Sequence, residues 1–352
     1  MIFRSVSIFT VTVLSLILIG CGGSNGTTRI NAGGATFIGP IMDRWATDYR
    51  GKTGVEIDYA KTGSGQGIRD MAAKNILFGC TDAPMNKDEL TKAEADGGPV
   101  LHIPLAMGAV AVIYDLPNIQ DLKLSGPVLA DIYLGHIKEW NDPKIASLNP
   151  GVTLPKLEIN RVTRDKDSGT TSIFTDYLSK VSNEFQAKVG MKKNMNDLKD
   201  VPGQAGNDGV AQFVKNTPGG LGYVELAFAY SGGITFAAIE NKAGKFVKPD
   251  TAAVTAAAAN AITEEKPGEP FTLHELTYSL TNAGGEDSYP IVGISYGVLY
   301  KKLPAASGKA VVDFLKWSVT DGQGVAAELH YAPLPEELQK KCLAKLAEVS
   351  FQ

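Results

Sequence analysis

The chain has 352 residues, of which 44% are hydrophobic and 20% are charged, and its formal net charge is −4 with an isoelectric point near 5.7. This length is enough for two lobes of ordinary size, and the composition is that of a soluble globular protein. The acidic balance argues against a general nucleic-acid-binding protein. It does not exclude an anionic ligand, because anion binding depends on local donors.

Residues 1–20 have the pattern of a targeting segment. They carry one charged residue, Arg4, followed by an almost entirely apolar run that ends at Cys21. The run is short for a membrane-spanning helix, which needs about 20 apolar residues, and a short anchor helix is the alternative interpretation. Leu18-Ile19-Gly20-Cys21 resembles the lipobox of bacterial lipoproteins. This resemblance implies a signal peptide over 1–20, lipid attachment at Cys21, a flexible tether over 21–28, and a location in the periplasm or at the cell surface.

The two other cysteines are Cys80 and Cys342. An even pair permits a disulfide in an oxidising compartment. However, Cys80 lies in a buried-strand pattern and Cys342 in a C-terminal helix, so we expect two free core residues. Neither the cysteines nor the four histidines have the spacing of metal ligands, and the sequence therefore indicates no metal site and no cofactor.

Strands and helices alternate after the tether. Apolar periodicity predicts, in chain order, a helix through 41–49, a strand at 55–59, a loop at 63–67, a helix at 68–74, strands at 76–81 and 110–114, a helix at 126–133, a strand at 157–162, a helix from 168, a helix at 210–214 capped by Asn207-Asp208, a strand at 221–224, a helix at 252–262, a strand at 291–299, and helices at 311–319 and 335–349. This rhythm predicts an α/β fold with largely parallel sheets.

The segment Arg164-Asp165-Lys166-Asp167-Ser168-Gly169-Thr170-Thr171 combines a guanidinium, hydroxyls and flexible backbone. The apolar spacing that follows starts a helix near Ser168. A helix start offers unpaired N–H donors and a positive dipole end, and arginine adds a planar fork that matches oxyanions. Taken alone, the segment is better explained as an ordinary N-cap, Asp167 or Ser168, with Arg164 paired to a nearby aspartate.

Two glycine-rich turns offer the same kind of donors. Gly33-Gly34-Ala35-Thr36-Phe37 precedes a predicted helix, and Gly63-Ser64-Gly65-Gln66-Gly67 follows a predicted strand. Each turn is individually compatible with a purely structural role. Ligands of open α/β sheets bind at the carboxyl ends of strands, however, and these turns fall there.

Asp82 directly follows an apolar strand and should lie at that strand's carboxyl end. It could be a turn or cap residue ahead of Pro84. A carboxylate is an acceptor only, so it repels a fully ionised oxyanion but accepts a proton from an anion that still carries one. Phosphate is protonated near neutral pH and sulfate is not, and a site built on this match can reject the wrong anion strongly.

Taken together and in this order, these segments resemble the phosphate-binding protein of bacterial phosphate ABC transporters, a periplasmic substrate-binding protein. The motifs that carry the resemblance are Ala35-Thr36-Phe37, Gly63-Ser64-Gly65, Thr81-Asp82-Ala83-Pro84, Arg164 with Ser168-Gly169-Thr170, Asp131 to Gly135 with Trp140, and Gly206-Asn207-Asp208-Gly209 with Gly222-Tyr223-Val224-Glu225. The resemblance runs from about Asn31 to the C-terminus. It implies a two-lobed fold, type II-like, that closes on phosphate in the cleft between the lobes.

The resemblance also implies a role for each matching residue. Thr36 would donate by its hydroxyl, Phe37 by its backbone N–H, and Ser64 from the second turn. Asp82 would accept the phosphate proton. Arg164, Ser168, Gly169 and Thr170 would donate from the other lobe. One position departs from the family pattern: Lys166 stands two residues after Arg164, where the family usually has an aspartate. The carboxylate that orients Arg164 has therefore moved to Asp165 or Asp167, or is missing.

The expected lobes are 29–108 with 291–352 and 109–290, with crossings near Met107–Ala111 and Pro290–Ile294. The expected function is high-affinity phosphate binding and delivery to an ABC transporter permease and ATPase complex by hinge closure, as a monomer outside that complex and not as an enzyme. The alternatives are a binder of sulfate or another tetrahedral oxyanion, a phosphate sensor or adhesin without transport, and, ranked low because no activated nucleophile is visible, a phosphatase.

Overall fold

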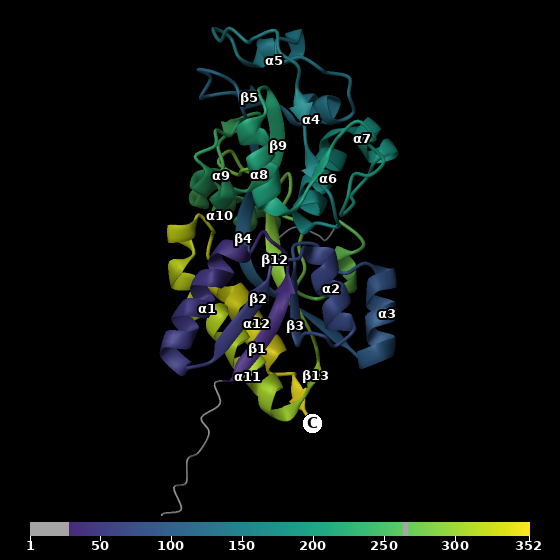
Figure 1. The fold of residues 1–352 in the computed structure, drawn as a ribbon, viewed down its shortest axis with the longest axis vertical. Helices are drawn as coiled ribbons and strands as arrows, with labels where there is room; N and C mark the ends of the chain where they lie inside the picture. Colours follow the sequence, from purple (N-terminus) through teal and green to yellow (C-terminus); the bar gives the residue numbers. More distant parts are fainter. Residues whose placement is uncertain (1–27, 263–266) are drawn as a thin grey trace, which may run out of the picture.

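The computed structural model describes residues 28–262 and 267–352. Two lobes are stacked along the long axis, and two strands labelled β4 and β12 run between them (Figure 1). Within the described residues, no helix is both long and apolar enough to span a membrane. The predicted signal peptide, the lipid attachment at Cys21 and all of the predicted tether except Thr28 lie outside the described residues.

Lobe I, the lower lobe in Figure 1, is built from both ends of the described chain. Its elements are β1 (Arg29–Gly34), α1 (Gly39–Thr53), β2 (Glu56–Ala60), α2 (Ser64–Ala72), β3 (Phe78–Thr81), α3 (Lys87–Gly97), β13 (Lys302–Leu303), α11 (Ala305–Ser318), two short 3₁₀ turns (Asp321–Val325 and Ala327–Leu329), α12 (Glu336–Leu346) and β14 (Ser350–Phe351).

Lobe II contains the middle of the chain. Its elements are β5 (Lys123–Leu124), α4 (Gly126–Tyr133), α5 (Pro143–Leu148), β6 (Asn160–Arg161), β7 (Thr163–Arg164), α6 (Gly169–Val181), α7 (Asn183–Lys188), β8 (Gly203–Gln204), α8 (Gly206–Asn216), β9 (Gly220–Glu225), α9 (Leu226–Gly232), β10 (Ala238–Glu240), β11 (Phe246–Val247) and α10 (Thr251–Ala261), followed by a 3₁₀ turn (Phe271–Leu273).

One seven-stranded sheet continues through both lobes, in the order β2-β1-β3-β12-β4-β9-β6. The long strands β4 (Val100–Tyr114) and β12 (Val292–Tyr300) are buried throughout. β4 pairs antiparallel with β12 over its first ten positions and with β9 from Val110 onward. β1 pairs in parallel with β2 and β3, and β6 with β9. The α/β architecture therefore has parallel outer strands around antiparallel crossing strands.

Most predicted elements are confirmed, and two differ for clear reasons. Residues 64–67, predicted as a loop, form the first turn of α2. A Cβ on Gly67 would lie 2.6 Å from the Cα of Gly34, so the glycines allow α2 to pack directly on β1, which overrides their weak helix propensity. β4 begins at Val100 instead of 110, and its register shifts opposite Ser295, next to Pro104, as expected for a proline at a bulge.

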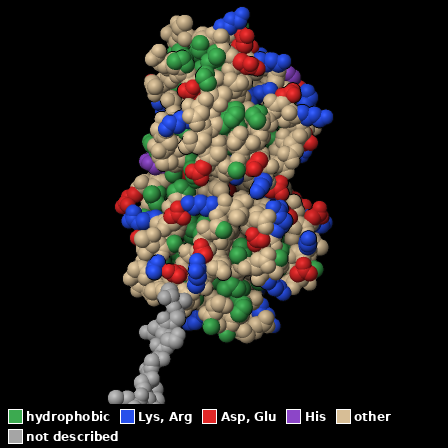
Figure 2. All heavy atoms as spheres, in the orientation of Figure 1, with side chains coloured by type: hydrophobic (Ala, Val, Ile, Leu, Met, Phe, Trp, Pro, Cys, Tyr) green, Lys and Arg blue, Asp and Glu red, His purple; other side chains and the backbone are tan. Residues whose placement is uncertain are grey.

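Both described cysteines, Cys80 in β3 and Cys342 in α12, are buried and free, as the sequence predicts. On the face drawn in Figure 2, acidic and basic side chains are mixed, without one extended basic region.

Candidate anion-binding site

The predicted site residues come together where the lobes meet. Lobe I contributes the ends of β1 and β3 and the start of α2, and lobe II contributes the end of β7 and the start of α6. All of the predicted polar side chains are buried, with exposed fractions of at most 5%: Thr36, Ser64, Asp82, Arg164, Ser168 and Thr170. The structure therefore places two polar walls, one from each lobe, against each other.

Ser64 joins the two walls directly. Its Oγ accepts the backbone N–H of Gly169 across the lobe boundary at 3.0 Å and the N–H of Asp82 at 3.3 Å. The same hydroxyl donates to Asp82 Oδ2 at 3.4 Å. A Cβ on Gly169 would lie 2.5 Å from the Cβ of Asp82, so only glycine permits this approach of the α6 N-terminus.

Asp82 is a buried carboxyl held by hydroxyls. Its Oδ1 accepts from Ser295 Oγ at 2.7 Å, in addition to the Ser64 contact at Oδ2. Burial raises the pKa of Asp82 to about 7, and the hydrogen bonds from Ser295, the charge of Arg164 and the bond from Ser64 oppose this shift. The carboxyl can thus hold or release a proton near neutral pH.

Thr36 and Thr170 are connected through Asn207, in the first turn of α8. Asn207 Nδ2 donates to Thr36 Oγ1 at 2.8 Å and lies 3.5 Å from Thr170 Oγ1, and its Oδ1 accepts from the N–H of Glu225. The predicted capping role of Asn207 is wrong, because Ala205 is the N-cap and no side chain caps α8. Asn207 instead connects the lobe I wall, through Thr36, with the lobe II wall, through Thr170.

Phe37 is anchored by Tyr331 of the same lobe, and Tyr331 also reaches Glu225 of lobe II. The Tyr331 hydroxyl donates to the backbone carbonyl of Phe37 at 2.6 Å and lies 3.1 Å from Glu225 Oε2. Burial raises the pKa of Glu225 well above its usual range. The Tyr331 hydroxyl has one proton, and the nearer of its two acceptors is the Phe37 carbonyl. The loop before α1 is thereby fixed in position.

Arg164 has no carboxylate within ion-pair distance among residues 28–262 and 267–352. Its Nη1 donates to Ser168 Oγ at 2.9 Å, and its buried Nε has no hydrogen-bond partner among the described residues. Asp165 and Lys166 are exposed. Asp167 turns away, with one oxygen accepting from Asn194 at 2.8 Å and the other lying 3.5 Å from Arg69 of lobe I. Of the alternatives open from the sequence, the orienting carboxylate is missing, and Ser168 takes its place.

Ser168 caps α6, as the sequence predicts, by accepting the N–H of Thr171 at 3.2 Å. Because Arg164 donates to the same oxygen, the guanidinium and the helix N-terminus form one rigid unit. This wall presents donors and positive charge, whereas the opposite wall presents the Asp82 carboxyl. The combination suits a tetrahedral oxyanion that still carries a proton.

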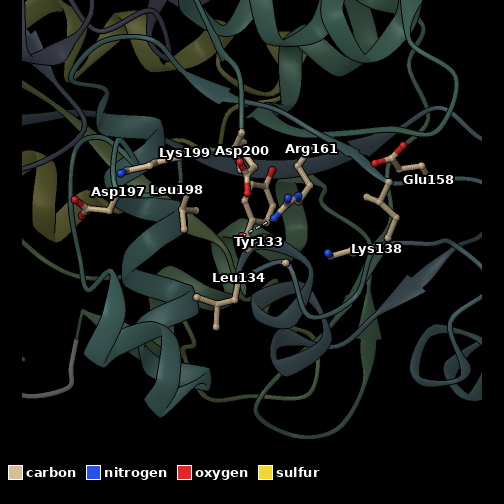
Figure 3. Close-up of a pocket in the computed structure, with 12 residues that line it drawn as sticks. Tyr133, Leu134, Lys138, Glu158, Arg161, Asp197, Leu198, Lys199 and Asp200 are labelled. Carbon is tan, nitrogen blue, oxygen red and sulfur yellow. Dashed lines mark hydrogen bonds between the residues drawn. The ribbon is translucent and has the colours of Figure 1, made fainter.

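Two other polar clusters in lobe II contain none of these residues. A pocket of about 530 Å³ is lined by both cations and carboxylates, among them Lys138, Arg161 and Asp200 (Figure 3). Arg161 Nη1 donates to the carbonyls of Ile132 and Tyr133 at the end of α4. This contact explains the arginine as a helix C-terminal partner.

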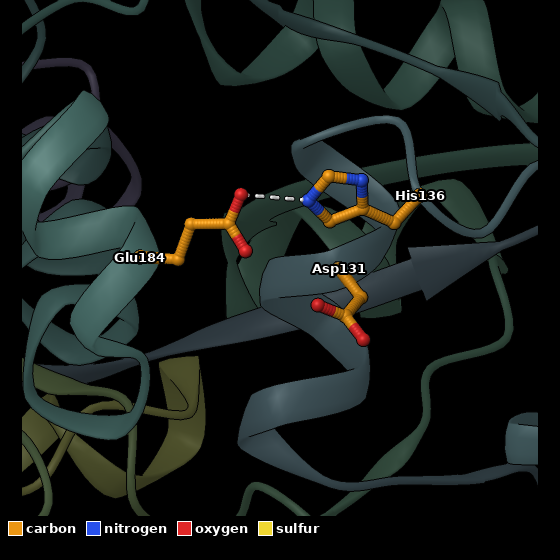
Figure 4. Close-up of side chains that lie close together, drawn as sticks. All are labelled: Asp131, His136 and Glu184. Carbon is orange, nitrogen blue, oxygen red and sulfur yellow. Dashed lines mark hydrogen bonds and ion pairs between the residues drawn. The ribbon is translucent and has the colours of Figure 1, made fainter.

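Asp131, His136 and Glu184 hold their ligand atoms within 4.8 Å of one another (Figure 4). Each carboxylate already has a lysine at 2.6 Å, Lys144 for Asp131 and Lys188 for Glu184. The trio is thus an ion-pair network on the surface of lobe II.

Two contributors were missed from the sequence. Ser295 is the one serine of strand β12, and no local sequence pattern specifies the register shift beside it that the structure shows. Asn207 lies within a motif that was interpreted as a cap.

Comparisons with known proteins identify the family of the chain and its fold. Residues 22–321 match the model of the PBP superfamily domain. The chain is 42% identical over 318 residues to the phosphate-binding protein PstS of Xylella fastidiosa strain 9a5c, covering 90% of this chain and 84% of the relative. It is 41% identical over 321 residues to PstS of Pasteurella multocida, covering 90% and 89%.

A solved structure of the phosphate-binding protein from Stenotrophomonas maltophilia has a TM-score of 0.70 at 17% identity, covering 90% of this chain and 93% of that chain. This likeness confirms the two-lobed periplasmic-binding-protein fold. The chain belongs to the PBP superfamily and, within it, to the family of the phosphate-binding proteins PstS.

Proposed function

We propose that the protein binds inorganic phosphate between its lobes and delivers it to an ABC transporter permease and ATPase complex. The observation that carries this proposal is Asp82, a buried carboxyl held by two serine hydroxyls opposite the N-terminus of α6. Such a carboxyl can share a proton with phosphate, whereas sulfate near neutral pH has no proton to offer.

In the proposed complex, Thr36 and Ser64 donate by their hydroxyls and Phe37 by its backbone N–H. Arg164 supplies charge-assisted bonds, and Ser168, Gly169 and Thr170 add hydroxyl and N–H donors. Phosphate would enter where the Gly169 N–H now meets Ser64 Oγ. The direct contacts between the walls are thus replaced by contacts through the ligand.

The proposed hinge lies at the two crossings, near Met107–Ala111 and Pro290–Ile294, so that the lobes comprise 29–108 with 291–352 and 109–290. The change of strand partner at Val110, where β4 leaves β12 for β9, supports this division. Phosphate would shift the open–closed equilibrium toward the closed state, because only there can one ligand contact both walls.

Calorimetric titration of the folded protein with phosphate and with sulfate tests the proposal. We expect tight phosphate binding and sulfate binding weaker by about 10⁴-fold, the scale that hydrogen-bond matching can reach. Equal affinities, or no phosphate binding, would contradict it. Phosphate uptake measured in cells that lack the gene separates transport from a sensor or adhesin role, and the absence of phosphate release from a generic ester would separate binding from phosphatase activity.

The remaining parts of the proposal concern location. Cys21 would carry lipid and hold the protein outside the cytoplasm, in the periplasm or at the cell surface, as a monomer when it is free of the transporter. Metabolic labelling with a fatty acid and the matched variant Cys21→Ser would test the anchor. Unlabelled wild-type protein would refute it.

A further inference from the structure

Lys193 lies in the segment between α7 and β8, directly behind the anion-binding turn of lobe II. Its backbone carbonyl accepts the N–H of Ser168 at 2.7 Å. Ser168 in turn caps α6 and receives Arg164 Nη1. The backbone of Lys193 is therefore joined by one hydrogen bond to Ser168, one of the donors that would face phosphate.

The side chain of Lys193 crosses to lobe I. Its Nζ lies 2.6 Å from Oε1 and 2.5 Å from Oε2 of Glu89 in α3. The exposed side-chain fractions are 13% for Lys193 and 24% for Glu89, so water screens this pair only in part. Two other ion pairs join the lobes among the described residues: Arg69 with Asp167, which is longer at 3.5 Å and more exposed, at 56% and 37%, and Lys345 with Glu275, whose carboxylate is 72% exposed.

Glu89 is held in place by its own helix. Its Oε2 accepts the N–H of Asn86 at 2.9 Å, and Asn86 Oδ1 accepts the N–H of Glu89, which forms a capping box at the start of α3. The carboxylate is thus oriented by lobe I alone. Lys193 reaches an acceptor that needs no rearrangement, which reduces the entropy cost of forming the pair.

We propose that Glu89 and Lys193 form a closure latch, with Lys193 as a positioning residue that slows phosphate release. This inference rests on the proposed function. The partners belong to different lobes, so the pair is made on closing and broken on opening. The latch stabilises the closed state without touching the ligand, and it therefore acts on dissociation more than on association.

Two variants remove the charges while keeping the local structure. Glu89→Gln preserves the capping box, because glutamine serves in the same position. Lys193→Met keeps the apolar stem and the carbonyl that holds Ser168. The matched control is Lys188→Met, whose ammonium pairs with Glu184 at 2.6 Å within α7 and does not cross the lobes.

The measurement is release of radiolabelled phosphate from the full protein during a chase with unlabelled phosphate. Each latch variant should release phosphate about 5- to 30-fold faster, the range for a partly buried, charge-assisted pair, with the association rate changed less than about twofold. The double variant should release phosphate no faster than the more affected single variant. Lys188→Met should match the wild type.

The latch is refuted if both single variants release phosphate at the wild-type rate, or if their effects multiply in the double variant. It is also refuted if association slows as much as release quickens, since that indicates a misplaced site. Wild-type protein that fails to bind phosphate at all would instead refute the proposed function, so the two failures are distinguishable.

Discussion

The two walls of the candidate site have different roles in anion recognition. The lobe I wall centres on an acid, Asp82, whose pKa is raised by burial and whose partners are the hydroxyls of Ser64 and Ser295. The lobe II wall centres on a cation, the Arg164 guanidinium, joined by Ser168 to a helix N-terminus. The lobe I wall can distinguish an anion that carries a proton from one that does not, and the lobe II wall attracts any oxyanion.

Because the two roles lie on different walls, affinity and selectivity should be separable by mutation. A change in the lobe I wall should alter which anion binds, and a change in the lobe II wall should alter how tightly every oxyanion binds. A result in which both walls affect phosphate and sulfate equally would remove the distinction.

The largest expected effect is on selectivity, in Asp82→Asn. The amide can donate to an unprotonated oxygen, so the preference for phosphate over sulfate should fall by about 10³-fold or more, from the discrimination that hydrogen-bond matching provides. Paired calorimetric titrations measure the ratio. Asp167→Asn is the control, since Asp167 lies at the lobe boundary but faces Arg69 and Asn194. An unchanged ratio would show that selectivity lies elsewhere.

The next effect is on affinity, in Arg164→Met. Loss of charge-assisted hydrogen bonds should lower the affinity for phosphate by about 100-fold, at about 1.5–3 kcal/mol for each such bond. The affinity for sulfate should fall by a similar factor. Arg161→Met is the control, because Arg161 donates to carbonyls at the end of α4. Loss of selectivity in Arg164→Met, with phosphate affinity retained, would reverse the roles of the walls.

The third effect is on stability. The pKa of Asp82 is about 7 in the folded protein against an ordinary value of 3.8, so between these pH values the folded state binds a proton that the unfolded chain does not. Stability from this group therefore falls as pH rises from about 4 to about 7. In the absence of phosphate, Asp82→Asn should raise the free energy of unfolding at pH 8 by about 2 kcal/mol, after allowance for altered hydrogen bonds.

Urea unfolding at pH 8 and at pH 4 measures this effect. The gain should be largely lost at pH 4, where the folded carboxyl is neutral and the pH is close to the ordinary pKa of 3.8 of the unfolded chain. A variant that is less stable than the wild type at pH 8 would mean that the charged carboxylate is compensated by its serine partners.

The smallest effect is expected from Lys166→Asp, which places a carboxylate where the family resemblance leads us to expect one. Lys166 is exposed and Arg164 already bonds Ser168, so phosphate affinity should change by less than about threefold, the scale of an exposed ion pair. Calorimetry at low and high salt measures it. A tenfold or larger gain would show that the missing carboxylate limits the lobe II wall.

The sequence predicted those parts of the site whose chemistry is local. Asp82 follows a strand, and Ser168 starts a helix, so each position could be assigned from its own segment. Gly169 was assigned only through the family resemblance, and its reason, contact with Asp82 and Ser64, became visible once the lobes were placed together.

Ser295 and Asn207 could not be predicted in their roles, because these depend on contacts between distant segments. Ser295 reaches Asp82 only through the register of β12, and that register shifts at a bulge that no local pattern specifies. Asn207 looks like a cap in sequence, yet α8 begins one residue earlier and turns its side chain toward Thr36. The first half of β4 was missed in the same way, since Pro104 weakens a strand pattern unless a bulge accommodates it.

The continuous seven-stranded sheet also bears on how the molecule loses its structure. β4 contributes buried residues to both lobes and hydrogen-bonds to β12 in one and β9 in the other. Melting either lobe would therefore strip partners from a strand that the other lobe needs. Despite its two-part outline, the protein should unfold in a single cooperative transition, with matching calorimetric and van't Hoff enthalpies, so that a lobe expressed alone would lack part of its own sheet.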